Sequence, residues 1–238
     1  MKLQDLNQLE ILHGTFTLIF IVISILLGIR IFLKYFTYKQ KQLITVGLTW
    51  IFLSSGWWGS GFSFLSILLI QKPLDQFTYL LIGNVFIPIA IICWIYSFTS
   101  LAYPNLKKKL LITYSVICTI FEIYLIISLL IDPNSIGIIT GTFYSQPNLI
   151  PMVFILFALI TTILTGILFS RNSIRSDKLE VHRKGIILLI AFISFTIGAF
   201  MDAAITLTPV TLIIVRLILI SSAIEYYFGF LLPERLAK

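Results

Sequence analysis

Long apolar segments alternate with short polar connections along the whole chain of 238 residues. The hydrocarbon core of a bilayer is about 30 Å thick, and a helix of about 20 apolar residues crosses it. The pattern therefore predicts an all-α membrane protein, a bundle of seven transmembrane helices forming one domain over residues 1–238. The predicted spans are 14–36, 43–70, 77–103, 110–131, 149–170, 185–205 and 208–232.

Two of these spans are interrupted near their middle. The second contains the sequence SSGWWGSGFS at 54–63, where the glycines weaken the helix and Trp57 and Trp58 lie far from the interfaces that tryptophan prefers. Either the rings fill gaps in a tight helix contact, or a kinked helix exposes an aromatic wall to a cavity. The third span carries Asn84 and Pro88. The proline predicts a kink, and Asn84 is compatible with a cavity or with an interhelical hydrogen bond.

A long connection between the fourth and the fifth predicted span covers 132–148. Within it, residues 136–145 are β-branched or aromatic around Gly137 and Gly141. This pattern favours a small β-hairpin that covers the outer mouth of the bundle, and a loose loop is the alternative.

Composition and charge fix the environment and the orientation. The chain is 58% hydrophobic and 11% charged, whereas soluble proteins carry about 25% charged residues. Its basic residues gather in the connections 37–42, 104–109 and 171–184, and basic connections stay in the cytoplasm. We therefore expect a multi-pass protein of the cell membrane with its N-terminus outside and its C-terminus in the cytoplasm. The net charge of +7 follows from this topology, so we expect the lipid bilayer and not nucleic acid as a partner.

The beginning of the chain predicts no cleavable signal peptide. Residues 1–10 are polar and carry both charge signs, with no basic run before the first apolar segment and no small-residue cleavage site.

Charged residues within the spans are the strongest candidates for a site, because a charge in hydrocarbon is costly and usually functional. Arg216 and Glu225 are nine positions apart, which places them on opposite faces of the last helix and requires protein on both sides of it. Glu122 lies about 15 Å and Arg216 about 12 Å from the outer end of their spans, so an ion pair is expected. Asp202, near the outer end of the sixth span, is a competing partner for Arg216.

A second ion pair is expected between Arg30 and Glu225. The two residues lie at similar depth, and the first and last helices of such a bundle are commonly neighbours. In the alternative, Arg30 extends its side chain to the interface near Lys34. Both pairs are compatible with a purely structural role.

Together these features predict a cavity in the outer half of the bundle. Its expected ligand-binding residues are Trp57, Trp58, Asn84, Glu122, Asp202 and Arg216.

The chain lacks the motifs of several enzyme classes. It has no H-E-x-x-H, no G-x-S-x-G and no phosphate-binding Gly-Lys-Ser/Thr loop. His13 and His182 lie on opposite faces of the membrane and cannot share a metal, and Cys93 and Cys118 lie in predicted spans as small apolar residues. No lysine occurs in the last span, which excludes a retinal Schiff base there. We expect no catalytic activity, no cofactor and no metal.

The sequence EYYFGFLLPERL at 225–236 resembles the closing helix of the seven-helix N-terminal sensor regions of prokaryotic membrane histidine kinases and of related stand-alone proteins. The resemblance rests on Tyr226, Tyr227, Gly229 and Phe230. It implies a sensor of a ligand or of the membrane state. The chain carries no histidine-phosphotransfer or ATP-binding domain, so the output is expected to pass to a separate partner.

Three functions are compatible with these observations. The first is a receptor-like sensor that signals to a cytoplasmic partner through the basic connection 171–184. The same connection is also compatible with binding of anionic lipid or with simple solvation. The second function is a small-solute or proton-coupled carrier, although carriers are usually built from internal repeats and none is evident here. The third is a structural or lipid-organising protein.

Overall fold

A computed structural model describes residues 3–204 and 208–231. Within these ranges seven helical segments are long and apolar enough to cross a membrane, which confirms the predicted spans. Two predicted span ends, Ile205 and Leu232, lie outside the described residues. The second and third spans are each built from two helices. The helices are α1 (Gln8–Tyr38), α2 (Gln42–Leu53), α3 (Trp58–Ile70), α4 (Gln76–Asn84), α5 (Ile87–Ala102), α6 (Lys107–Ile131), α7 (Leu149–Ile174), α8 (Leu179–Ala204) and α9 (Pro209–Leu231).

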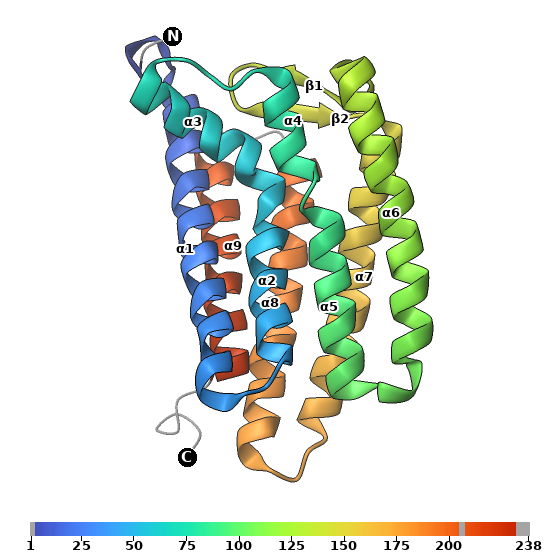
Figure 1. The fold of residues 1–238 in the computed structure, drawn as a ribbon. Coiled ribbons are helices and arrows are strands. Elements are labelled where there is room, and N and C mark those ends of the chain that lie inside the picture. The colour runs from blue at the N-terminus through green and yellow to red at the C-terminus, as the bar shows by residue number, and fades with distance from the viewer. Residues whose placement is uncertain (1–2, 205–207, 232–238) are drawn as a thin grey trace.

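Six spans form a closed ring, and the fourth lies outside it. Around the ring, α1 packs on α2, α2 on α5, α5 on α7, α7 on α8, α8 on α9, and α9 returns to α1. The remaining span, α6, packs on α5 at one edge of the bundle (Figure 1). It is also the least buried of the spans, so most of its surface is left for lipid. The last helix has protein on two sides, α1 and α8, as its opposed charges predict.

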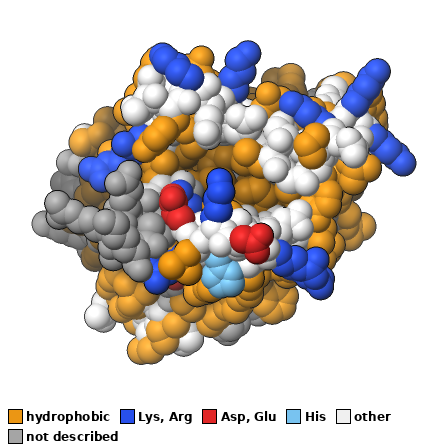
Figure 2. Space-filling model, turned by 90° about the horizontal axis from the view of Figure 1, so that it is seen from below, with side chains coloured by type: hydrophobic (Ala, Val, Ile, Leu, Met, Phe, Trp, Pro, Cys, Tyr) orange, Lys and Arg blue, Asp and Glu red, His pale blue; other side chains and the backbone are white. Residues whose placement is uncertain are grey.

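The two ends of the bundle differ in charge. We call the end that carries the β-strands the hairpin end, and the end formed by the connections 39–41, 103–106 and 175–178 the basic end. Of the lysines and arginines in the described ranges, all but Lys72 and Arg216 belong to the basic half of the bundle. Figure 2 views the basic end and shows lysine and arginine side chains around its rim. The first helix begins at the hairpin end (Figure 1).

Both predicted interruptions are present. The second span changes from α2 to a 3₁₀ turn at Ser54–Trp57 before α3 begins. The third span breaks after α4, and α5 starts at Ile87 with Pro88 in its first turn. A proline costs little there, because the backbone N–H groups of a first helical turn have no partner within the helix.

Two of the helices that start at the hairpin end, α1 and α4, have polar side-chain caps. At α1, Asn7 Oδ1 accepts from the backbone N–H of Glu10, and the Glu10 carboxylate accepts from the backbone N–H of Asn7. At α4, the Asp75 carboxylate accepts from the hydroxyl and the backbone N–H of Thr78. These two hydrogen bonds lower the pKa of Asp75 because they favour its charged form, and the bond from the Thr78 hydroxyl has the larger effect.

The predicted hairpin is formed by β1 (Gly137–Thr140) and β2 (Tyr144–Pro147), which pair antiparallel. Gly141 follows β1 with a φ of +68°, a conformation that glycine adopts without strain. Phe143, also in the turn, is buried and packs edge-on against Phe64 of α3. The turn is thereby held against the helices, and the hairpin covers part of the end of the bundle, near α4 and α6 (Figure 1).

The basic half of the bundle is filled by large side chains. Trp50, Trp94, Phe192 and Tyr226 are each at most 1% exposed and belong to one apolar cluster. Tyr226 stacks on Trp50 with ring centroids 4.3 Å apart. This packing closes the interior below the site described next.

Candidate functional site

Arg216 of α9 is buried in the hairpin half of the bundle, with 1% of its side chain exposed. Its guanidinium is bound on three sides. Nε donates to Thr17 Oγ1 at 3.0 Å, Nη1 donates to Asp202 Oδ1 at 2.8 Å, and Nη2 lies 3.3 Å from His13 Nε2. The arginine therefore joins three helices, α1, α8 and α9.

The positions of these partners follow from the ring order. Both α1 and α8 are direct neighbours of α9. His13 and Thr17 are four residues apart and therefore lie on one face of α1, about one turn apart. Asp202 lies in the last turn of α8, at the same end of the bundle. The short connection from α8 to α9 brings Asp202 close to Arg216 in space.

Trp57 completes the polar cluster around Asp202. Its indole Nε1 donates to Asp202 Oδ2 at 2.6 Å, so each carboxylate oxygen accepts from a different residue. The Trp57 ring packs edge-on against Phe20 of α1 and Phe195 of α8. The 3₁₀ turn at Ser54–Trp57 directs this side chain inward.

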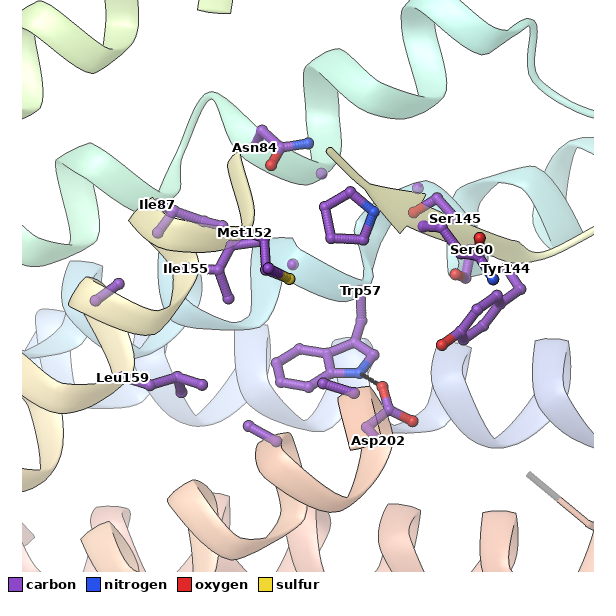
Figure 3. A pocket seen from close by; sticks show the side chains of 18 of the residues that line it. Trp57, Ser60, Asn84, Ile87, Tyr144, Ser145, Met152, Ile155, Leu159 and Asp202 are labelled. Atoms are coloured by element: carbon purple, nitrogen blue, oxygen red, sulfur yellow. Dashed lines mark hydrogen bonds between the residues drawn. The ribbon is translucent and has the colours of Figure 1, made fainter. Parts of the chain in front are cut away.

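A cavity of about 660 Å³ opens beside this cluster. Its described lining comes from the hairpin and from every span except α6. The volume lies within the range of about 300–1,000 Å³ that is usual for small-molecule sites. Figure 3 shows Trp57 near the middle of the cavity, with mainly apolar side chains and Asn84 on one side and polar side chains on the other.

The hairpin forms part of the wall of the cavity at this end and is anchored through a backbone carbonyl. Ser60 Oγ of α3 and the Tyr79 hydroxyl of α4 donate to the carbonyl oxygen of Phe143, at 2.7 and 2.8 Å. A carbonyl oxygen has two lone pairs, so it accepts both bonds. Tyr144 and Ser145, the next residues, line the cavity.

Four of the six predicted ligand-binding residues line this cavity: Trp57, Asn84, Asp202 and Arg216. In the described part of the chain Asn84 makes no interhelical hydrogen bond, which was the alternative. Its Nδ2 donates to Leu80 O within α4. Trp58 is not in the lining. Its Nε1 donates to Ser54 Oγ, and its ring packs against Phe86 with centroids 5.0 Å apart.

The expected ion pair between Glu122 and Arg216 does not form. Glu122 lies on α6, outside the ring, and is not among the residues that line the cavity. One of its carboxylate oxygens is buried and has no hydrogen-bond partner among the described residues. The estimated depths of the two residues in the membrane were compatible with a pair. However, α9 packs on α1 and α8 within the ring, whereas α6 lies outside the ring and packs on α5. Asp202, the competing candidate, is the partner.

The expected pair between Arg30 and Glu225 is also absent. Glu225 accepts a hydrogen bond from Ser221 Oγ, one turn earlier in α9. Arg30 is exposed and lines a shallow depression at the basic end with Lys34 and Tyr227. Its exposure fits the alternative, in which the side chain extends to the interface.

Sequence reasoning missed three contributors to the site: His13, Thr17 and Tyr144. For the first two a signal was present, because they lie four residues apart and near the same end of the bundle as Arg216. No sequence signal singled out Tyr144, whose place depends on the register of the hairpin.

The fold and the site define a multi-pass helical membrane protein with a cavity in one half of its bundle. Comparisons with models of protein families, with curated proteins and with solved structures found no match for the chain. Its function is therefore inferred from its sequence and its geometry.

Proposed function

We propose that the protein is a receptor-like membrane sensor that binds a ligand in the cavity at its hairpin end and signals at its basic end. The segment 171–184, which comprises the end of α7, the connection 175–178 and the start of α8, passes the signal to a cytoplasmic partner. By the distribution of lysine and arginine, the hairpin end and the N-terminus face outward.

The observation that carries this proposal is a continuous series of aromatic contacts from the cavity to the basic end. Trp57 and Phe195, which both line the cavity, have ring centroids 6.1 Å apart. Phe195 lies 5.4 Å from Trp50, Trp50 lies 4.3 Å from Tyr226, and Tyr226 lies 5.0 Å from Phe230. Close-packed interiors shift between discrete arrangements, so a displaced Trp57 ring changes its neighbours in turn.

The far end of this series reaches the helices beside the connection. Phe230 of α9 stacks on Phe169 of α7, with ring centroids 5.8 Å apart, and Phe169 lies just before the segment 171–184 on the same helix. Tyr226 and Phe230 also belong to the segment that resembles the closing helix of histidine-kinase sensor regions. The resemblance and the ring contacts support the same output end.

The two alternative functions explain less of the structure. A carrier needs a route beyond the cavity, whereas Trp50, Leu219 and Tyr226 fill the interior below it and are at most 1% exposed. A structural role accounts for the pair of Arg216 and Asp202 but not for a cavity of about 660 Å³ beside it.

A covalent occupant of the cavity tests the proposal without knowledge of the ligand. Gly83 lines the cavity, and a Cβ added there meets nothing within 4 Å. Gly83→Cys, with Cys93 and Cys118 replaced by alanine, is modified with N-ethylmaleimide in lipid nanodiscs. We expect hydrogen exchange of residues 171–184 to change on modification, because the occupant displaces Trp57 and the rings that follow.

The matched control is Ile120→Cys, which places the same adduct on the exposed face of α6. It is expected to leave exchange in 171–184 unchanged. Complete modification at Gly83→Cys with identical exchange in 171–184 would mean that the cavity and the basic end are not coupled, and the sensor proposal would fail.

A further inference from the structure

We infer that the cavity takes an amphiphile from the bilayer, with an uncharged or cationic head that donates hydrogen bonds to Asp202 and an apolar tail between α5 and α7. This inference rests on the proposed function and specifies the class of ligand. It excludes fatty acids and other amphiphiles whose head is an anion.

The cavity has a polar and an apolar side, and Trp57 lies between them. In Figure 3 the side chains of Ile87, Met152, Ile155 and Leu159 lie on one side of the Trp57 ring. On the other side lie Ser60, Tyr144, Ser145 and Asp202. A ligand that fills both sides must itself be amphipathic. The polar groups of a wholly polar molecule would have too few hydrogen-bond partners on the apolar side of the cavity.

The charge that meets the head is negative. Arg216 is 1% exposed, and its three nitrogens are directed to Thr17, Asp202 and His13. The Asp202 side chain is 18% exposed and lines the cavity. A carboxylate or phosphate head would therefore approach the Asp202 carboxylate, whereas Arg216, although it lines the cavity, is almost fully buried and already pairs its charge with Asp202.

His13 does not reverse this sign. The Arg216 guanidinium can only donate, so His13 Nε2 must accept with its lone pair, and the ring proton is on Nδ1. His13 is then neutral, and the charges of Arg216 and Asp202 cancel. The cluster has no net charge, and its anionic member is the one that faces the ligand.

Unused hydrogen-bonding capacity lies beside the carboxylate. Tyr144 lines the cavity, and its hydroxyl has no hydrogen-bond partner among the described residues. In Figure 3 the Tyr144 side chain points toward Asp202 and Trp57. A hydroxyl, amine or amide head can donate to Asp202 and also bond to Tyr144, whereas a carboxylate can do only the second.

The lining also offers a route from the bilayer. Met152 and Leu156 of α7 and Phe200 of α8 line the cavity and are exposed on the surface of the bundle. These three apolar side chains lie toward the hairpin end, where α7 begins and α8 ends. These side chains connect the cavity with the surface of the bundle near these two helix ends, and an apolar tail can enter there.

Three amphiphiles with the same chain and different heads test the inference: decylamine, 1-decanol and decanoate. Each is titrated into the full-length protein in nanodiscs, and the thermal unfolding midpoint is followed, since a ligand of the folded state raises it. Gly83→Phe, which fills the cavity from an open position, corrects for effects on the lipid. Decylamine and decanol are expected to raise the unfolding midpoint of the wild type by much more than they raise that of Gly83→Phe. Decanoate is expected to bind at least about tenfold more weakly, the factor for a difference of about 1.4 kcal/mol.

Tyr144→Phe provides a second readout, because it removes the free hydroxyl from a partly exposed residue of the hairpin. It is expected to weaken decanol binding several-fold. Decanoate binding that equals or exceeds decylamine binding would overturn the ligand class, and so would equal shifts in the wild type and Gly83→Phe for all three. Neither result affects the hydrogen-exchange test with maleimide, so the sensor proposal is judged separately.

Discussion

Replacement of Asp202 by alanine is expected to reduce the free energy of unfolding by about 3–5 kcal/mol, the usual cost of leaving a buried charge without its partner. Arg216 is almost fully buried, and its remaining partners, Thr17 and His13, are neutral. The substitution also leaves the Trp57 indole without its acceptor. The measurement is denaturant unfolding of the purified protein in detergent micelles.

Two variants show whether the loss comes from the unpaired charge. Glu122→Ala removes another carboxylate of a span, one that pairs with no residue of the described ranges, and is expected to change stability by about 1 kcal/mol or less. Combining Asp202→Leu with Arg216→Met removes both charges and is expected to recover most of the loss. Equal losses for Asp202→Ala and Glu122→Ala would show that the ion pair does not stabilise the fold.

Gly47→Ala is expected to destabilise the protein by about 1–3 kcal/mol, the cost of overpacking a close contact. Gly28 of α1 and Gly47 of α2 lie against each other where these helices cross. A Cβ added at Gly47 would lie 2.5 Å from the carbonyl oxygen of Gly28, and one added at Gly28 would lie 2.8 Å from that of Gly47. Because the obstacle is backbone, the helices must move apart, and close approach is what small residues allow in membranes.

The matched control is the same substitution at Gly83, where an added Cβ meets nothing within 4 Å. Since glycine within a helix costs roughly 0.5–1 kcal/mol relative to alanine, Gly83→Ala is expected to stabilise the protein slightly. Both variants are compared by the same denaturant unfolding. A Gly47→Ala variant as stable as Gly83→Ala would contradict the close crossing of α1 and α2.

Most of the fold was predictable because its signals are local in the sequence. Apolar runs gave the spans, the glycines and Trp57 gave the break after α2, and Pro88 gave the break before α5. The hairpin followed from β-branched residues around Gly141. Its second strand ends at Pro147, two residues beyond the end of the expected segment 136–145. Each of these features depends on neighbours along the chain.

The partners of the buried charges were only partly predictable. Counting residues from the end of a span gives depth, and at that level Glu122 matched Arg216 and Arg30 matched Glu225. Depth does not give the position around the bundle, and α6 lies outside the ring. Asp202 was the better candidate because a short connection joins its helix to that of Arg216.

The two adjacent tryptophans show a similar limit. Successive residues of a helical turn point about 100° apart, so Trp57 and Trp58 could not share one environment. Which of them faces the cavity depends on how the 3₁₀ turn rotates α3 relative to α2. The structure places Trp57 beside Asp202 and Trp58 against Phe86.

Thiol accessibility tests the central claim, a cavity that opens toward the hairpin end and is closed toward the basic end. Gly83→Cys and Ala90→Cys lie in the same span; Gly83 lines the cavity, and Ala90 is 0% exposed about two turns further on. Cys93 and Cys118 are replaced by alanine, and a membrane-impermeant maleimide is added to intact cells. We expect rapid modification of Gly83→Cys and none of Ala90→Cys. Modification of Ala90→Cys, or of Gly83→Cys only after the cells are opened, would contradict the account.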